Sequence, residues 1–426
     1  MDVSFTDSNF RHYLIAAVLF SCLPWLPCTD AHAQGADDRR TVTERFRGVL
    51  PAGGIPIGAM RLYPQLGLGL NWSDNVFADN TFEESDWASM LLAEARLESI
   101  TSLYSAEVGG RADVARFDKF SSNDFENIRF WITGDKDLPS SNVALDFEIA
   151  DLAEPRTSVD AAGNATELTT YGLVDLGAAY TYSPGRWIAR LDGTYRNFDF
   201  NDTETLTGTI DNGDRNRSVK DFGLRLGYEM SELYGVFFEP RYTQVDYDQR
   251  VDNRGFERSS TGYEIRLGTN LKYSGVVTGE LFVGYYNREF DDVAFGTVKG
   301  PSFGGEVDWS ISRLTTLTLA ASRTTDATTL AGASTTINTR FSLGIDHELR
   351  RNLLLQLDIE TANEDFDGIP REDDVTRAAV ATEYRVSHKL RLKASYRYSD
   401  RNPTPPGAGG RDFEINEVMV EVVFQL

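Results

Sequence analysis

The stretch GYEIRLGTNLKY, residues 262–273, decides the fold class of this chain. The residues at every second position from Tyr263 to Leu271 are mostly apolar. Charged residues such as Glu264 and Arg266 lie between them. A repeat of two residues is the period of a β-strand, because successive side chains of a strand point to opposite faces. The sequence therefore predicts a strand with one apolar and one charged face.

The same pattern recurs from about Tyr63 to Leu426, in runs of roughly ten residues separated by turns. Strands of about ten residues suit a tilted membrane crossing, whereas strands of soluble proteins average about five or six. The connections alternate between short turns and long polar loops. The short turns are expected near residues 99–102, 134–141, 183–186, 230–233, 274–276, 310–314, 347–352 and 386–389.

This sorting of connections by length is typical of outer-membrane barrels, which have short periplasmic turns, long extracellular loops and an even number of strands. A soluble β-sandwich has no reason to sort its loops in this way. We therefore predict an all-β protein, a closed antiparallel transmembrane β-barrel of about 18 strands, with about 16 as the alternative. Its predicted location is the bacterial outer membrane, in contact with lipid and lipopolysaccharide.

Aromatic residues and the C-terminal strand support this prediction. Six aromatic side chains lie beside short turns, where they would form a girdle at the level of the lipid headgroups: Tyr182, Trp187, Tyr228, Tyr234, Tyr273 and Trp309. The last strand, residues 417–426, alternates apolar residues and ends in Leu426. It resembles the signal that the barrel-assembly machinery reads, although the usual last residue is Phe.

The N-terminal region is predicted to form no part of the barrel wall. Residues 1–33 contain an apolar run too short to span a membrane and end in Ala31-His32-Ala33, so they are expected to be a cleaved signal peptide. Both cysteines lie in this segment, which excludes thiol chemistry from the mature chain. Residues 34–59, rich in Gly and Pro, are expected to be a flexible periplasmic segment or to fold into the lumen; residues 60–426 form the barrel.

The net charge of the chain also excludes some partners. It is -23 at pH 7 for the whole chain and remains strongly negative without residues 1–33. Nucleic acid is therefore not an expected partner, because its phosphates need Lys and Arg.

A short motif near the start of the predicted barrel resembles one known family. Arg61-Leu62-Tyr63-Pro64 opens the first strand and Asp74-Asn75-Val76-Phe77 follows it, and this pair of motifs is similar to the opening of the putative β-barrel porin 2 family. The resemblance implies an outer-membrane barrel, often linked to exopolysaccharide systems. From the residues alone, Pro64 suits the first position of a strand and Asp74-Asn75 suits a turn.

Charged residues on the face opposite the apolar stripe are the candidate functional residues. A charge facing hydrocarbon at the midplane would cost roughly 2–4 kcal/mol, so these side chains are expected to face a wet lumen and to pair across strands. The candidates are Glu94, Arg96, Arg129, Arg190, Arg225, Arg241, Glu264, Arg266, Arg340, Arg391, Lys393 and Arg397. The stripe of Arg391, Lys393 and Arg397 could guide an anionic polymer or offset Glu383 and Glu421.

Catalytic and metal sites are not indicated. His347 and His388 are predicted in short periplasmic turns, away from the outer rim, and no Gly-x-Ser-x-Gly elbow occurs. Acidic loops such as 199–216 and 364–374 contain oxygen donors that suit Ca²⁺, but no calcium-loop spacing is intact, so we expect solvated loops. No cofactor and no metal site is predicted.

Three functions follow as hypotheses. The first is a channel, which the resemblance connects with export of an exopolysaccharide or another surface glycan and with periplasmic export components. Since 18 strands leave an aqueous channel in porins, an open pore is preferred over a plugged lumen. The alternatives are a non-conducting structural or adhesive barrel that acts through its long loops, and a general diffusion porin.

Overall fold

The computed structural model describes residues 41–47, 51–101, 104–273, 276–405 and 410–426. The predicted signal peptide, residues 1–33, lies outside the described residues. The described chain is almost entirely β-structure, with one short helix, α2 (Val42–Arg47), and two 3-10 turns, η2 (Ser121–Asn123) and η3 (Gly213–Arg215).

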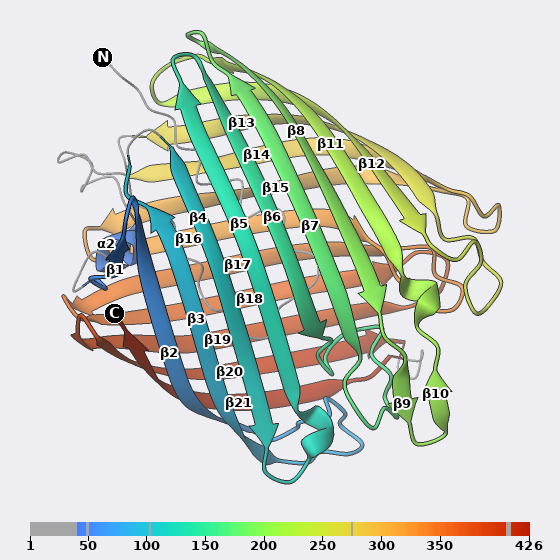
Figure 1. The fold of residues 1–426 in the computed structure, drawn as a ribbon. Helices are drawn as coiled ribbons and strands as arrows, with labels where there is room; N and C mark the ends of the chain where they lie inside the picture. Colours follow the sequence, from blue (N-terminus) through green and yellow to red (C-terminus); the bar gives the residue numbers. More distant parts are fainter. Residues whose placement is uncertain (1–40, 48–50, 102–103, 274–275, 406–409) are drawn as a thin grey trace.

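Long antiparallel strands form a closed barrel, as predicted (Figure 1). There are 18 of them, joined in sequence order. They are β2 (Met60–Ser73), β3 (Asp86–Ser99), β4 (Ser105–Phe117), β5 (Phe125–Leu138), β6 (Ser141–Ala153), β7 (Thr170–Tyr182), β8 (Trp187–Phe200), β11 (Arg217–Glu229), β12 (Tyr234–Tyr247), β13 (Ser260–Tyr273), β14 (Val277–Phe290), β15 (Thr297–Ser312), β16 (Thr315–Asp326), β17 (Thr336–Arg350), β18 (Leu353–Phe366), β19 (Glu372–Ser387), β20 (Leu390–Thr404) and β21 (Phe413–Gln425).

Three short strands lie outside this wall. β1 (Ile55–Ile57) pairs with the start of β2, and β9 (Thr203–Thr205) pairs with β10 (Gly208–Ile210) inside one long loop. The barrel closes where β2 pairs with β21, from Gln65 opposite Gln425 to Ser73 opposite Glu417. Closure removes the open sheet edges that hydrocarbon cannot satisfy with hydrogen bonds.

The two faces of the wall carry opposite kinds of side chains. On β13, Tyr263, Ile265 and Leu267 point outward and are 64%, 53% and 58% exposed, whereas Glu264 and Arg266 on the other face form ion pairs inside the barrel. Large apolar side chains exposed in water would be unfavourable over so wide an area. The outer surface is therefore the lipid-facing surface, and the inner surface is the polar one.

The six aromatic residues expected in a girdle lie at the short-turn ends of their strands and on the outward face. Five are largely exposed, and Trp187 packs against the sixth, Tyr228, with ring centroids 4.8 Å apart. Amphipathic rings in this position suit the boundary between hydrocarbon and headgroups.

Two local expectations are wrong. The turn predicted near residues 134–141 is shorter, because β5 continues to Leu138 and β6 begins at Ser141. Pro64 is not the first residue of its strand but lies where one edge of β2 changes partner, from β1 at Leu62 to β21 at Gln65. A residue without an N–H donor fits this change of partner.

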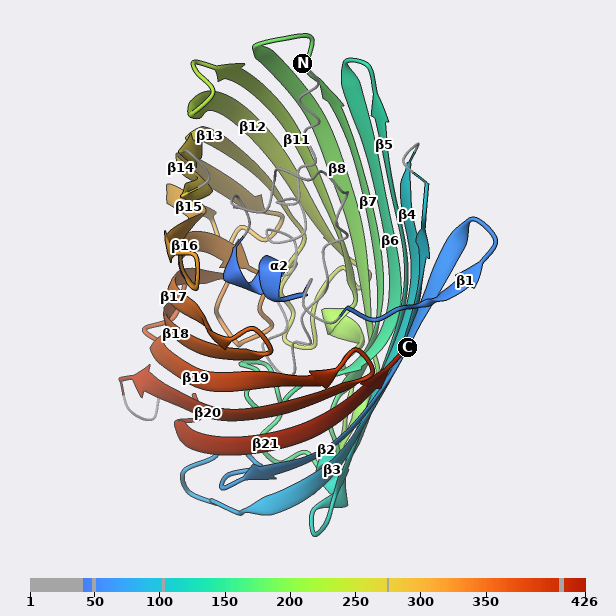
Figure 2. The same ribbon diagram turned by 90° about the vertical axis from the view of Figure 1, so that its left-hand side faces the viewer.

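The helix α2 lies within the ring of strands, near the end where the short turns are (Figure 2). Val42 and Phe46 are buried against Leu354, and the backbone N–H of Val42 donates to Thr316 Oγ1 over 2.9 Å. Of the two alternatives left open for residues 34–59, residues 42–47 follow the one in which the segment folds into the lumen. The free energy gained by burying two apolar side chains outweighs the cost of forming so short a helix.

Candidate functional site

The inner wall of the barrel is built from charged side chains on neighbouring strands. Antiparallel register places residues of one face directly opposite each other, as with Glu239 and Arg266 or Arg241 and Glu264. Because Arg has five donors in a fixed fork, each can contact carboxylates on more than one strand. The wall thus becomes a network of shared ion pairs rather than a set of separate charges.

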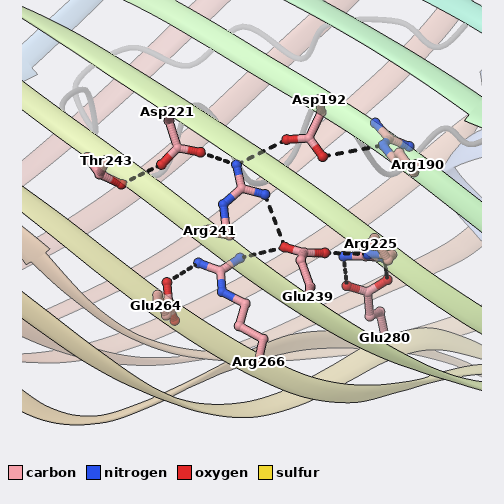
Figure 3. Close-up of polar contacts among 10 residues, drawn as sticks. All are labelled: Arg190, Asp192, Asp221, Arg225, Glu239, Arg241, Thr243, Glu264, Arg266 and Glu280. Carbon is pink, nitrogen blue, oxygen red and sulfur yellow. Dashed lines mark hydrogen bonds and ion pairs between the residues drawn. The ribbon is translucent and has the colours of Figure 1, made fainter.

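The largest network spans β8, β11, β12, β13 and β14 (Figure 3). Its centre is Glu239, whose side chain is 1% exposed. One of its oxygens accepts from Arg241 Nη1 at 3.0 Å and from Arg266 Nη1 at 3.4 Å, and the other accepts from Arg225 Nε. Arg225 also forms two hydrogen bonds to Glu280, of 2.7 and 2.9 Å. Three guanidinium groups therefore share one buried carboxylate.

Arg241 connects this centre to the strands on its other side. Its Nη2 lies 3.1 Å from Asp192 Oδ2 on β8 and also contacts Asp221 on β11. Arg190 Nε lies 3.8 Å from the other oxygen of Asp192. This chain of contacts extends the network along the lumen wall (Figure 3).

The predicted lumen residues fall into separate groups on the inner face. Arg190, Arg225, Arg241, Glu264 and Arg266 belong to the network around Glu239. Glu94 and Arg96 on β3 pair with each other at 3.0 Å. The other predicted residues lie elsewhere: Arg129 on β5, Arg340 on β17, and Arg391, Lys393 and Arg397 on β20.

The basic stripe on β20 is matched by carboxylates. Lys393 Nζ lies 3.4 Å from Glu421, Arg397 Nη1 lies 3.3 Å from Glu417, and Arg391 Nη1 lies 3.8 Å from Glu383. These pairs match the interpretation that the stripe offsets its acidic neighbours. That the stripe and the other inward charges line a conducting path stays a prediction.

Long loops pack together over the external end of the barrel. Asp160, in the loop between β6 and β7, accepts a 3.1 Å hydrogen bond from Thr328, in the loop between β16 and β17 on a distant part of the wall. Arg258, in the loop between β12 and β13, donates to the carbonyl oxygens of Thr328 and Ala333 at 2.6 and 3.0 Å. We expected solvated loops at residues 199–216 and 364–374, but Arg215 in the first loop and Arg371 in the second are buried.

Buried ion pairs hold these loops. Arg258 and Asp252 have side chains 2% exposed and are 2.6 Å apart. Burial by itself would raise the pKa of Asp252, but the backbone N–H of Phe256 and the Arg258 guanidinium outweigh it and lower that pKa. Arg215 and Glu154 form a bidentate pair of 2.7 and 3.0 Å, which raises the pKa of Arg215 although burial opposes this. The loops are therefore fixed by charge pairs that a solvated loop would lack.

The family motif fastens the closing strands together. Asp74 accepts two hydrogen bonds of 2.7 Å from Asn416 on β21, one from its backbone and one from its side chain. Asn75 is 2% exposed and donates to the carbonyl oxygen of Glu414 at 3.1 Å. Phe77 packs edge-on against Phe120, with ring centroids 5.1 Å apart. The motif thus holds the seam between the first and last strands of the barrel.

The histidines and the metal-type clusters were the remaining candidates for chemistry. No cluster of three or more His, Asp or Glu side chains with metal-binding geometry occurs among the described residues. His347 lies on β17 rather than in a turn, with its Nδ1 3.0 Å from Thr315 Oγ1.

Comparison with known proteins identifies the family. The family model described as putative beta-barrel porin 2 matches residues 50–426. The chain belongs to this family. Its members are porin-like barrels, and this barrel accordingly lies in the bacterial outer membrane. No curated protein matches the chain. Among the described residues, no helix has the length and apolar character required to cross a bilayer.

Solved structures show a similar architecture at low identity. Pseudomonas aeruginosa OccK5 (OpdH) is 10% identical, with a TM-score of 0.43 over 87% of this chain and 99% of that one. OccK2 (OpdF) of the same species, in complex with glucuronate, is 10% identical, with a TM-score of 0.45 over 86% and 98%. The ferric citrate transporter FecA in its unliganded form is 9% identical, with a TM-score of 0.46 over 82% of this chain and 61% of that one.

Sequence reasoning missed the buried arginines of the loops. Arg156, Arg258 and Arg371 lie in polar loops and are 8%, 3% and 4% exposed. Arg156 and Arg371 are the only cations in loops 154–169 and 367–371, and this was the available signal. It could not be used, because its partners lie on loops far away in the sequence.

Proposed function

We propose that the protein is a passive outer-membrane channel that conducts hydrophilic solutes through its charged lumen. One observation carries the proposal: the inner face of a closed 18-strand wall is a network of ion pairs, while the outer face is apolar. Barrels of this size leave an aqueous interior in porins. Fixed, paired charges favour hydrated solutes over apolar ones, because a polar wall replaces part of the lost hydration.

The loops over the external end suggest a narrow path. The contacts of Asp160 with Thr328 and of Arg258 with the same loop join different parts of the rim. A path restricted in this way suits small solutes or one extended polymer chain. The family resemblance supports an exopolysaccharide or other surface glycan as the exported polymer. General diffusion of small polar solutes fits the same wall.

Conductance of the purified protein in planar bilayers tests the channel. We expect discrete openings of constant size. Glu239→Gln should shift the reversal potential in a salt gradient towards anion preference, because three arginines lose the carboxylate they share. Glu126→Gln is the matched control, since this exposed residue lies at the external end of β5 and pairs with Arg116 instead.

Two outcomes would change the proposal. The absence of reproducible openings would contradict conduction and favour a structural or adhesive barrel. The glycan substrate is tested separately by deleting the gene. Unchanged amounts of secreted and surface-bound glycan would contradict export and leave general diffusion as the function.

A further inference from the structure

A small polar cavity lies at the external end of the barrel, where three loops meet. Its volume is about 140 Å³, and it is lined by Thr157, Ser158, Arg371, Arg401, Arg411 and Phe413 among others. These residues come from the loop between β6 and β7, the loop before β19, the ends of β20 and β21, and the connection between these two strands, which carries Arg411. Three guanidinium groups therefore face one cavity of small-molecule size.

Two of these arginines are neutralised by carboxylates. Arg371 Nε donates to Asp373 Oδ1 at 2.7 Å, and Arg401 lies 3.0 Å from the other oxygen of Asp373 and 3.2 Å from Glu364. The side chains of Arg371 and Arg401 are only 3% and 4% exposed. This part of the cavity wall has two positive and two negative charges.

Arg411 is not neutralised in this way. Its Nη2 donates to the carbonyl oxygens of Arg156, Ser158 and Ala161 at 2.6, 3.4 and 3.2 Å. These acceptors are dipoles and carry no net charge. Among the described residues no carboxylate forms an ion pair with Arg411. The carboxylates of Asp79 and Glu154 attract Arg411 from a greater distance, so its positive charge is only partly offset.

Arg156 adds a second cation to the same region. It is 8% exposed, and it donates to Asn123 Oδ1 at 2.9 Å and to the carbonyl oxygens of Ala165 and Ser122. Burial, together with the charge of Arg411, lowers the pKa of Arg156 to about 10. Burial also lowers the pKa of Arg411. Two partly buried cations thus destabilise each other, a cost that an anion would remove.

We propose that this cavity is a binding site for a small anion, a carboxylate or phosphate group carried by a solute at the external mouth. Guanidinium groups bind both kinds of anion through charge-assisted hydrogen bonds. Thr157 and Ser158 also line the cavity and add no negative charge to it. One bound anion would balance the excess positive charge of Arg411 and Arg156.

The inference deepens the proposed function, because it names a substrate class for the mouth of the channel. It can be tested without conduction. The experiment is isothermal titration of the full mature barrel in lipopolysaccharide-free detergent, with sodium phosphate and sodium acetate at fixed ionic strength. We expect saturable binding of at least one of them at one site per chain, and the tighter of the two identifies the class.

A matched pair of variants tests the location of the site. Thr157→Asp keeps nearly the same side-chain volume but places a fixed carboxylate in the lining, and it should weaken anion binding by at least about tenfold. Thr157→Asn has the same shape without the charge and should bind as the wild type does. Arg411→Gln should also weaken binding, whereas Arg116→Gln at another part of the external rim should not.

The result that overturns the proposal is clear. Either no saturable binding of phosphate or acetate, or binding that is equal in wild type, Thr157→Asp and Arg411→Gln, would contradict an anion site in this cavity. A wild-type protein that binds the anion but does not conduct would contradict only the channel. A wild-type protein that conducts but does not bind the anion would contradict only the site.

Discussion

Arg241 on β12 reaches across β11 to Asp192 on β8, with Nη2 3.1 Å from Oδ2, and it passes over Gly223 on the way. A Cβ atom at Gly223 would lie 2.6 Å from Arg241 Nη1 and 3.0 Å from both carboxylate oxygens of Asp192. The missing side chain of Gly223 is therefore what allows residues two strands apart to form an ion pair.

Replacing this glycine should break the pair. We expect Gly223→Ala to destabilise the barrel by about 1–3 kcal/mol, because the added methyl group displaces Arg241 and leaves Asp192 less well paired. The measurement is the midpoint temperature of unfolding in detergent. It is read from the change in gel mobility that accompanies heat unfolding of a barrel. Gly134→Ala is the control, since a Cβ there meets nothing within 4 Å. Equal stability of both variants would contradict the role given to Gly223.

Single lysine substitutions can test which side chains face the lipid and which face the lumen. Leu267→Lys places a charge on the outer face of β13, where Leu267 is 58% exposed, and should cost roughly 2–4 kcal/mol of stability in lipid. Ala320→Lys places the same charge on the inner face, opposite Glu306, and should cost much less. Urea unfolding in lipid vesicles compares them. A larger loss for Ala320→Lys would reverse the assignment of the two faces.

The seam between β2 and β21 should depend on the family motif. Asn75→Ala removes the hydrogen bond to Glu414 and the one accepted from the backbone N–H of Asp79, and it should lower the unfolding free energy by about 1–3 kcal/mol. Asn164→Ala is the control, because that side chain is exposed and forms a long hydrogen bond of 3.3 Å to Thr207. If the two variants unfolded alike, the motif would not be holding the seam.

The pairing of Asp252 with Arg258 predicts how the loops respond to acid. The pKa of Asp252 is lowered in the folded protein, so its contribution to stability is present above the ordinary Asp pKa of about 3.9 and is lost as the pH falls through the lower, folded value. Hydrogen exchange of residues 327–335 should therefore stay slow from pH 7 to about pH 4 and accelerate below it, after correction for intrinsic rates. Asp252→Asn should exchange fast at every pH. Protection that decreased already between pH 7 and 5 would contradict this assignment.

The sequence was sufficient to predict the strands of the barrel wall and their two faces. It was not sufficient to predict the ion pairs in the lumen or the contacts among the external loops. The alternation of Glu264 with Ile265 determines which side chain meets lipid, because a strand has only two faces. Glu239 pairs with three arginines because of the register between three strands. This register cannot be read from the sequence of any one strand. The docking of Phe46 on Leu354 joins residues about three hundred positions apart, and local composition could not decide between a flexible segment and one that folds into the lumen.

A cysteine scan at one pair of neighbouring positions tests most directly that polar solutes pass through the charged lumen. Ala320 lies on the inner face of β16, and Leu319 beside it is 49% exposed on the outer face. A charged thiol reagent added during single-channel recording should reduce the current stepwise in Ala320→Cys and leave that of Leu319→Cys unchanged. An unchanged current in Ala320→Cys after complete labelling, or no current in the parent protein, would contradict conduction through this lumen.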